Sequence, residues 1–309
     1  MPPSGSSSKQ VSFPSAKYRP VAFAFISLLS VFLLYQFVGG GITALLFGNV
    51  RPEREALAFR LSTMLGEILF ILVPTFFLAR LQSKDWKSLL RLRKADWYYI
   101  GLAVIGVVAL QQLMEIYLYL QGLIPLPDRM KEIIDRFQQA IDQTYAVLVT
   151  ANSPTEFFFV VLVVAVTPAV CEETLFRGLV QSNLELPMSR SKAIVLTGAI
   201  FAAYHLDPFS FVALCALGIY LSFLVSVSGS IIVPIVAHFT NNFISSLVLY
   251  KFGAESLITP RNQKPGAGYL IGWSVVLFLV FLATIRLTMN RNRSDGSVHG
   301  GGTNEIGQE

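Results

Sequence analysis

Two long stretches of this sequence contain no Asp, Glu, Lys or Arg, and they constrain the fold more than any other feature. One lies between Arg19 and Arg51, and the other runs from Pro208 to Tyr250. A helix needs roughly 20 mostly apolar residues to cross a hydrocarbon core of about 30 Å. Hydrophobic residues make up 53% of the chain and charged residues only 14%, where a soluble domain is about a quarter charged. We therefore expect an integral membrane protein.

The apolar segments predict an all-α bundle of about eight transmembrane helices. The charge-free stretch 208–250 is too long for one helix, and Ser228-Gly229-Ser230 divides it, because Ser and Gly clusters mark turns. The predicted spans lie in the first part of 20–50, at about 61–79, at 97–120, from 156 past 171, at 193–205, on either side of 228–230, and at 268–285. Eight spans place both termini on one side of the membrane.

Composition divides the chain into five parts. These are a polar N-terminal tail, 1–19; the first three helices with an amphipathic loop helix, 20–150; a core of helices four to seven, 151–250; the last helix, 251–293; and a Gly-rich tail without expected order, 294–309. The amphipathic segment has apolar residues at helical spacing, namely Met130, Ile133, Ile134, Phe137, Ile141, Tyr145 and Leu148. Such a helix either lies in the membrane interface or packs on the spans, and the sequence leaves both open.

The basic residues flank the apolar segments instead of forming one block, a pattern that favours membrane topology over nucleic-acid binding. We count 14 of them on the side of the termini and nine on the opposite side. Because Lys and Arg are enriched in cytoplasmic loops, we expect both termini in the cytoplasm. The compact chain and its short loops favour the plasma membrane. The two cysteines lie inside apolar runs, which excludes a secreted disulfide scaffold.

Charged or titratable residues inside the predicted spans are the functional candidates, because each charge costs at least about 2.5–3.5 kcal/mol at mid-bilayer. They are Glu67, Glu115, Glu172, Glu173, Arg177, His205 and His238. Glu115 lies near the outer end of its span. Glu67 is deeper, and a base from another span could pair with it.

The other five candidates fall into three short motifs on spans four, five and seven. The motifs are Glu172-Glu173…Arg177, Phe201…His205 and His238…Asn242. On a helix Glu173 and Arg177 stack one turn apart and can form an ion pair, while Glu172 lies about 100° round the axis and can face a cavity. His238 and Asn242 share a helix face, so two donors can point to one place.

This set contains the parts of a hydrolytic site. Glu172 can act as a general base, with His205 holding or deprotonating a water molecule. His238 and Asn242 can donate hydrogen bonds to the oxyanion that forms when water attacks a peptide carbonyl. For Glu172 to reach the depth of the two histidines, span four must continue as a helix toward Glu185, which buries Arg177.

The three motifs, in this order, resemble those of the CPBP intramembrane glutamic proteases, the family that includes the type II CAAX prenyl endopeptidases and abortive-infection-type proteins. The family pattern is EExxxR, FxxxH and then HxxxN or HxxxD, and this sequence matches it at every named position over about residues 155–250. The resemblance implies an intramembrane endopeptidase in which Glu172, His205, His238 and Asn242 are catalytic. It implies supporting roles for Glu173, Arg177 and Phe201, and a protein or peptide substrate, with or without a lipid anchor.

Three alternatives stay open at this point. Glu172, His205 and His238 could form a zinc site, although Asn242 fits an oxyanion donor better than a ligand, so we expect no cofactor. A transporter also buries Glu, Arg and His, but its polar residues usually occur in matched halves of the chain. A non-catalytic membrane scaffold would function without Glu172.

Overall fold

The computed structural model describes residues 16–48, 52–252 and 266–298, and this part of the chain contains helices but no β-strand. Short π-helical segments, η1 to η4, interrupt several of the helices. The first elements are α1 (Pro20–Leu33), η1 (Leu34–Gly39), α2 (Gly40–Phe47), α3 (Pro52–Glu67), η2 (Ile68–Leu72), α4 (Val73–Gln82), α5 (Trp86–Leu89), α6 (Trp97–Gln121) and α7 (Asp128–Val149). They are followed by α8 (Pro154–Val161), η3 (Leu162–Val166), α9 (Thr167–Glu173), η4 (Thr174–Val180), α10 (Gln181–Glu185), α11 (Arg190–Tyr204), α12 (Phe211–Ser228), α13 (Ile232–Phe252) and α15 (Ala267–Val298).

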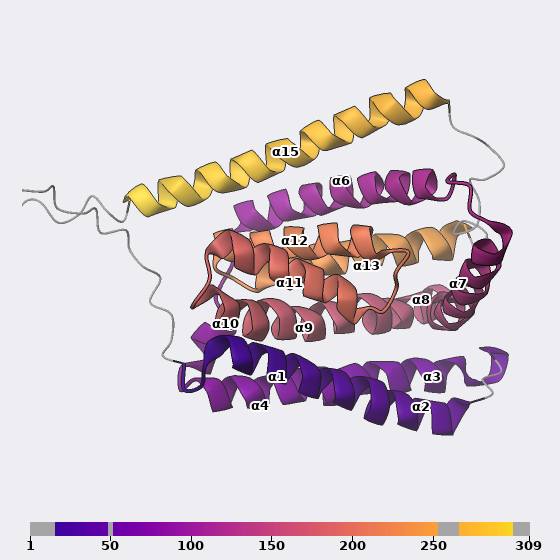
Figure 1. The fold of residues 1–309 in the computed structure, drawn as a ribbon, viewed down its shortest axis with the longest axis horizontal. Coiled ribbons are helices and arrows are strands. Elements are labelled where there is room, and N and C mark those ends of the chain that lie inside the picture. The colour runs from indigo at the N-terminus through magenta and orange to yellow at the C-terminus, as the bar shows by residue number, and fades with distance from the viewer. Residues whose placement is uncertain (1–15, 49–51, 253–265, 299–309) are drawn as a thin grey trace, which may run out of the picture.

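The long helices run side by side as a layered bundle (Figure 1). α15 lies on the outside against α6, and α6 packs on α12 and α13. α11 and α12 pack closely on each other, and α13 contacts α9. On the far side of α9 lies the pair of helices formed by α1–α2 and α3–α4.

Seven helices in the described ranges are long and apolar enough to cross a membrane, so the prediction of an all-α multi-pass membrane protein is confirmed. The eighth predicted span corresponds to α11, which has 15 residues and is shorter than a full crossing. α11 still carries the chain back along the bundle (Figure 1). The start of α1 therefore lies beside the end of α4, where Lys17 N donates to Gln82 O. Near the end of α15, Arg291 pairs with Asp96 at the start of α6.

One continuous helical stretch, Pro154–Glu185, forms the centre of the bundle. At a rise of about 1.5 Å per residue its 32 residues are about 48 Å long, which exceeds the hydrocarbon thickness. The segment from Glu173 to Leu184 is buried throughout, because helices pack on every side of it. The sequence required span four to continue as a helix toward Glu185 and to bury Arg177. In the structure the helix continues to Glu185 and Arg177 is fully buried.

Two glycines allow α11 and α12 to approach each other closely. A Cβ on Gly198 would lie 2.6 Å from the backbone N of Ile219, and a Cβ on Gly218 would lie 2.8 Å from Gly198 O. The predicted break between spans six and seven is present as well. α12 ends at Ser228 and is capped by Gly229, whose φ of 67° is in the left-handed region that glycine adopts without strain.

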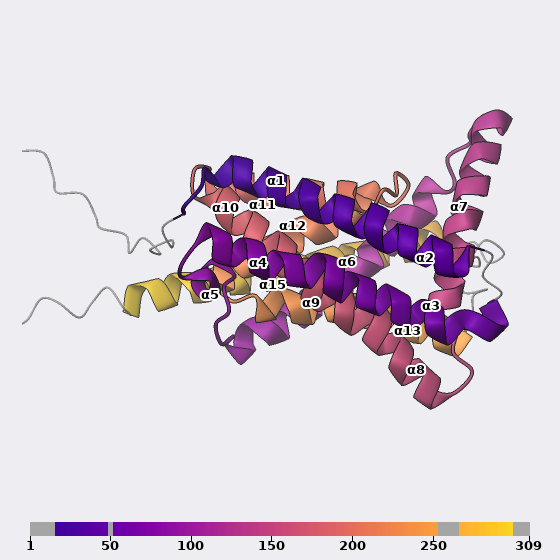
Figure 2. The ribbon, with the colours of Figure 1, turned by 90° about the horizontal axis from the view of Figure 1, so that it is seen from below.

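The predicted amphipathic helix is α7, which crosses one end of the bundle (Figure 2). Its C-terminal part packs on the bundle through Tyr145 and Leu148.

Arg60 binds this end of the helix: its guanidinium donates to the carbonyls of Val147, Leu148 and Thr150 and pairs with Glu156. Toward the N-terminus of α7, Met130, Ile133 and Phe137 are exposed. The C-terminal half of α7 therefore fits the prediction of a helix packed on the spans, and the N-terminal half fits that of a helix in the membrane interface.

The ends of the chain lie largely outside the described residues. Most of the predicted N-terminal tail, 1–15, and residues 299–309 of the predicted C-terminal tail are not described. α15 continues to Val298, which extends helix into the first part of the 294–309 segment. At the start of α6, Asp96 caps the helix by accepting a hydrogen bond from Tyr98 N. This hydrogen bond, together with Arg291, lowers the pKa of Asp96.

Candidate functional site

A fully buried ion pair lies at the centre of the site. Arg177 Nη1 donates to Glu173 Oε1 over 2.9 Å, and both side chains are inaccessible. The same carboxylate oxygen lies 2.8 Å from His238 Nδ1 on α13. The second guanidinium nitrogen, Arg177 Nη2, donates to Gly218 O on α12 over 3.1 Å. Glu173 and Arg177 therefore connect three helices, and the charges balance each other in a place where an isolated charge would be very costly.

Glu172 and His205 form a second pair that is more accessible. Glu172 Oε2 and His205 Nε2 are 3.9 Å apart, and the side chains are 19% and 31% exposed. The other ring nitrogen, His205 Nδ1, lies 2.7 Å from Phe201 O, one turn earlier on α11. Because a carbonyl only accepts, Nδ1 carries the proton, and in the neutral ring Nε2 presents its lone pair toward Glu172.

The end of α11 explains why His205 can bind that carbonyl. The helix ends at Tyr204, and Leu206 has a φ of 54°, which turns the chain out of the helix. As a result His205 N bonds to Ala202 O instead of Phe201 O. Phe201 O is left for the imidazole.

Phe201 packs between the two pairs. Its ring lies 4.4 Å from the Arg177 guanidinium, and its centroid is 4.6 Å from that of His205 and 5.9 Å from that of His238. The side chain is fully buried. A cation over an aromatic face is favourable in a place without water, so Phe201 supports both Arg177 and the two imidazoles.

Asn242 lies one turn beyond His238 on α13, and Pro168 determines its main contact. Asn242 Nδ2 donates to Val164 O over 3.2 Å, and its Oδ1 accepts from Asn241. Pro168 has no N–H, so the carbonyl four residues earlier, Val164 O, lacks its usual helical donor. One Asn242 amide hydrogen is therefore used by the central helix, and the other is left for a ligand.

The structure brings the predicted site residues together in two groups, Glu172 with His205 and Glu173 with Arg177 and His238. The predicted ion pair of Glu173 and Arg177 is present. The histidine of the third motif contacts Glu173, whereas Glu172 faces the histidine of the second motif. Among the described residues, no group of three or more His, Cys, Asp or Glu is arranged to hold a metal ion. A chelator experiment tests the zinc alternative.

Sequence reasoning missed two contributors to this site, Gly218 and Tyr204, and did not predict the surroundings of Glu67. Gly218 supplies the carbonyl that accepts from Arg177, and Tyr204 places a buried hydroxyl without a hydrogen-bond partner within electrostatic reach of Glu172. Glu67, expected to be a lone acid that a base could neutralise, forms no ion pair with any base in the described ranges and interacts electrostatically with Glu172. For Gly218 and Tyr204, the only local signal was the position of Tyr204 beside His205.

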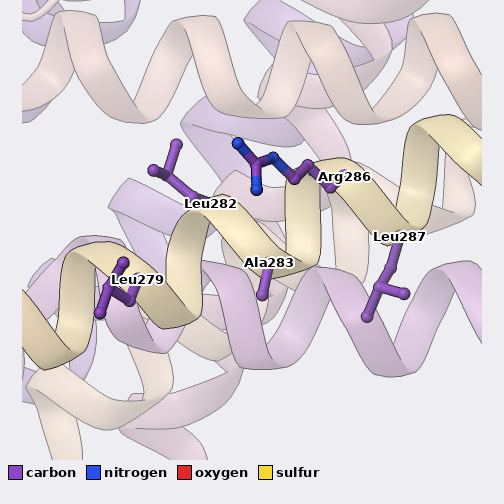
Figure 3. Close-up of a pocket in the computed structure, with 5 residues that line it drawn as sticks. All are labelled: Leu279, Leu282, Ala283, Arg286 and Leu287. Carbon is purple, nitrogen blue, oxygen red and sulfur yellow. The ribbon is translucent and has the colours of Figure 1, made fainter.

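A shallow hollow of about 370 Å³ lies on α15, away from these residues (Figure 3). It is lined by Leu279, Leu282, Ala283, Arg286 and Leu287, all on one helix. The lining is apolar apart from Arg286 and contains no residue of the three motifs. The hollow is therefore not part of the candidate site.

The fold and the site together define a class, a multi-pass helical membrane protein with Glu, His and Arg side chains held inside its bundle. Residues 154–244 match the family model described as type II CAAX prenyl endopeptidase Rce1-like. This match confirms the resemblance found in the three motifs and indicates a protease, and thus a hydrolase. No curated protein and no solved structure matches the chain.

Proposed function

We propose that this protein is a glutamate-dependent intramembrane endopeptidase, with Glu172 and His205 as the residues that activate water. The observation that carries the proposal is the pairing of Glu172 Oε2 with His205 Nε2 at 3.9 Å, on partly accessible side chains, beside a buried and charge-balanced Glu173–Arg177 pair. A water molecule about 2.8 Å from both atoms fits this separation. Both atoms accept hydrogen bonds, so they orient the water oxygen lone pairs away from themselves and toward a substrate.

In the proposed reaction the water oxygen attacks the peptide carbonyl and a C–O bond forms. The water proton passes to Glu172 or His205. The C–N bond then breaks, and the same proton goes to the leaving amine, which balances the reaction without a covalent intermediate. No serine or cysteine nucleophile is required.

His238 and Asn242 are the proposed oxyanion donors. Because His238 Nδ1 faces Glu173, the free ring nitrogen is Nε2, and it can donate to the oxyanion when both ring nitrogens carry a proton. The second amide hydrogen of Asn242 is the other donor. Preorganised donors of this kind contribute most in a place from which water is excluded.

The proposed substrate is a protein or peptide with a C-terminal CAAX-type sequence, cut after the cysteine. Two observations support this choice: the family whose model matches residues 154–244, and the position of the site inside the membrane-spanning region. Glu172 lies 13 residues before the end of the Pro154–Glu185 span, or about 20 Å along the helix. A substrate that carries a lipid would bring its scissile bond to such a depth. Removal of a leader peptide is the alternative reaction, and the experiment below includes it.

The test uses purified protein in lipid nanodiscs with two fluorogenic peptides that end in the same CAAX sequence, one farnesylated and one not, and with a fluorogenic leader peptide as a third substrate. We expect cleavage after the farnesylated cysteine, slower cleavage of the unmodified peptide, and cleavage by Glu172→Gln that is at least about 100-fold slower than by the native protein. Glu115→Gln is the matched control, because Glu115 is an acid on α6 outside the site, and it should cleave like the native protein. Activity should survive treatment with a zinc chelator.

Three results would overturn parts of the proposal. Full activity of Glu172→Gln would remove the mechanism. Loss of activity on chelation, with recovery on addition of zinc, would support the alternative site of Glu172, His205 and His238. Cleavage of a leader peptide, with neither CAAX peptide cut, would replace the substrate.

A further inference from the structure

Glu67 is the most deeply buried acid that the proposed mechanism leaves unused. It is 8% exposed, and its Oε2 atom is buried without a hydrogen-bond partner. It lies at the junction of α3 and η2, both of which pack on α9, the helix that carries Glu172. The carboxyl groups of Glu67 and Glu172 are close enough to interact electrostatically, and Glu172 Oε2 also lacks a hydrogen-bond partner.

Two neighbouring carboxyl groups in a buried place favour a singly protonated state, because their mutual repulsion adds to the lost hydration of a second charge. A proton held by one of them removes the repulsion and lets that group donate a hydrogen bond to the other. The remaining question is which of the two holds the proton.

Glu67 and Glu172 differ in the charges near them and in their exposure, and this difference indicates which of them holds the proton. Around Glu67 lie Tyr35, Cys171 and Glu172, none of which is a cation. Glu172, in contrast, interacts with the Arg177 cation and faces His205, and its side chain is 19% exposed. We therefore place the shared proton on Glu67, the more deeply buried acid, which has no cation nearby among the described residues.

We propose that Glu67 is a positioning residue of the protease site, a protonated carboxylic acid that donates a hydrogen bond to Glu172 and holds it as the ionised base. The inference rests on the proposed function, since it assigns Glu67 a task in the same reaction. It acts through Glu172 and does not touch the substrate. Its removal therefore affects the chemical step and leaves substrate binding in place.

The experiment compares Glu67→Gln with Glu67→Leu on the farnesylated reporter peptide in nanodiscs. Glutamine has the shape of a protonated glutamate and keeps a donor, whereas leucine has similar volume and none. A hydrogen bond to a charged group corresponds to a factor of about 10 to 100 in rate. We expect Glu67→Leu to lower kcat by that factor with KM within about twofold, and Glu67→Gln to restore most of the native kcat.

Glu115→Leu is the matched control, because it also exchanges an acid on a long apolar helix for leucine, and its kcat should not change. The double variant Glu67→Leu with Glu172→Gln should be no slower than Glu172→Gln alone, since a residue that acts through Glu172 has no effect once the base is gone. Thermal unfolding of each variant shows whether it is folded. If Glu67→Leu does not fold, Glu67→Met replaces it in the same comparison.

A Glu67→Leu protein with native kcat, or a Glu67→Gln protein as slow as Glu67→Leu, would overturn the inference. Either result, obtained with an active native protein and an inactive Glu172→Gln protein, leaves the proposed function intact. If the native protein and Glu172→Gln behave alike, the proposed function fails before Glu67 is considered. The two failures are thus distinguishable.

Discussion

Single side chains in this protein have very different surroundings even where their sequence patterns agree. Glu173 and Arg177 form an ion pair one helical turn apart, and so do Glu132 and Arg136 on α7. The first pair is inaccessible, whereas the side chains of the second are 62% and 77% exposed. Burial, and not the spacing of the residues, determines how much each pair contributes.

Glu172→Gln and His205→Ala should each lower kcat at least about 100-fold, the usual contribution of general acid–base catalysis. The reason is that each removes one of the two acceptors that orient the water. Initial rates on the farnesylated reporter, with thermal unfolding as a check on folding, measure the effect. The mechanism would be wrong if both variants kept native rates.

Glu173→Gln should destabilise the protein far more than Glu132→Gln. Loss of one partner in a buried pair costs about 3–5 kcal/mol because the remaining charge stays buried. Loss of an exposed pair costs about 0–1 kcal/mol. Thermal unfolding in the same detergent compares the two substitutions, and equal unfolding temperatures would contradict the account of the buried pair.

At the scale of elements, the site depends on how tightly α11 packs on α12. The contact at Gly198 and Gly218 sets the distance between these helices and places Phe201 beside Arg177, with His205 against the Phe201 ring. The three motifs and the helices that carry them were predictable from the sequence, because apolar spans and i, i+4 spacings are local. The contact of His238 with Glu173, 65 residues away, was not predictable, and neither was the electrostatic interaction of Glu67 with Glu172. Both depend on how each helix is rotated in the bundle.

Gly198→Ala should destabilise the protein and slow cleavage. The added Cβ would lie 2.6 Å from a backbone atom of α12, so the helices must separate, at a cost of about 1–3 kcal/mol. Gly101→Ala on α6 is the control, because a Cβ there meets nothing within 4 Å. Thermal unfolding and the reporter rate should both fall for position 198 and neither for position 101.

Arg60→Met should loosen α7. Arg60 is the buried donor that binds the C-terminal carbonyls of α7 and the carboxylate of Glu156, and a helix end without these partners frays. Limited proteolysis should cut within 128–149 faster than in the native protein. Arg136→Met, an exposed change on the same helix, should be cut at the native rate; equal protection of both variants would refute the role of Arg60.

At the scale of the whole molecule, the described ends of the chain lie at the same end of the bundle. This follows from the contacts of Lys17 with Gln82 and of Arg291 with Asp96. The sequence predicted this arrangement through the number of spans, although α11 is too short to have been counted by length alone. The direction of the bundle in the membrane stays a prediction from the charge bias.

Single cysteines test that direction. Cys171 and Cys215 are first replaced by alanine, and Lys131→Cys or Lys94→Cys is then introduced. Lys131 on α7 and Lys94 before α6 are both exposed and lie at opposite ends of the bundle. In intact cells a membrane-impermeant maleimide should label the cysteine at 131 and leave that at 94 unlabelled until the cells are lysed. The reverse pattern would mean that the termini are outside.

The most direct test of the central claim is a comparison of peptide termini in membranes from cells that express the native protein and cells that express Glu172→Ala at matched levels. The account predicts new termini that occur only with the native protein, located after a cysteine near the C-terminus of their substrates. Identical sets of termini, with both proteins folded and abundant, would contradict it and favour a transporter or a scaffold.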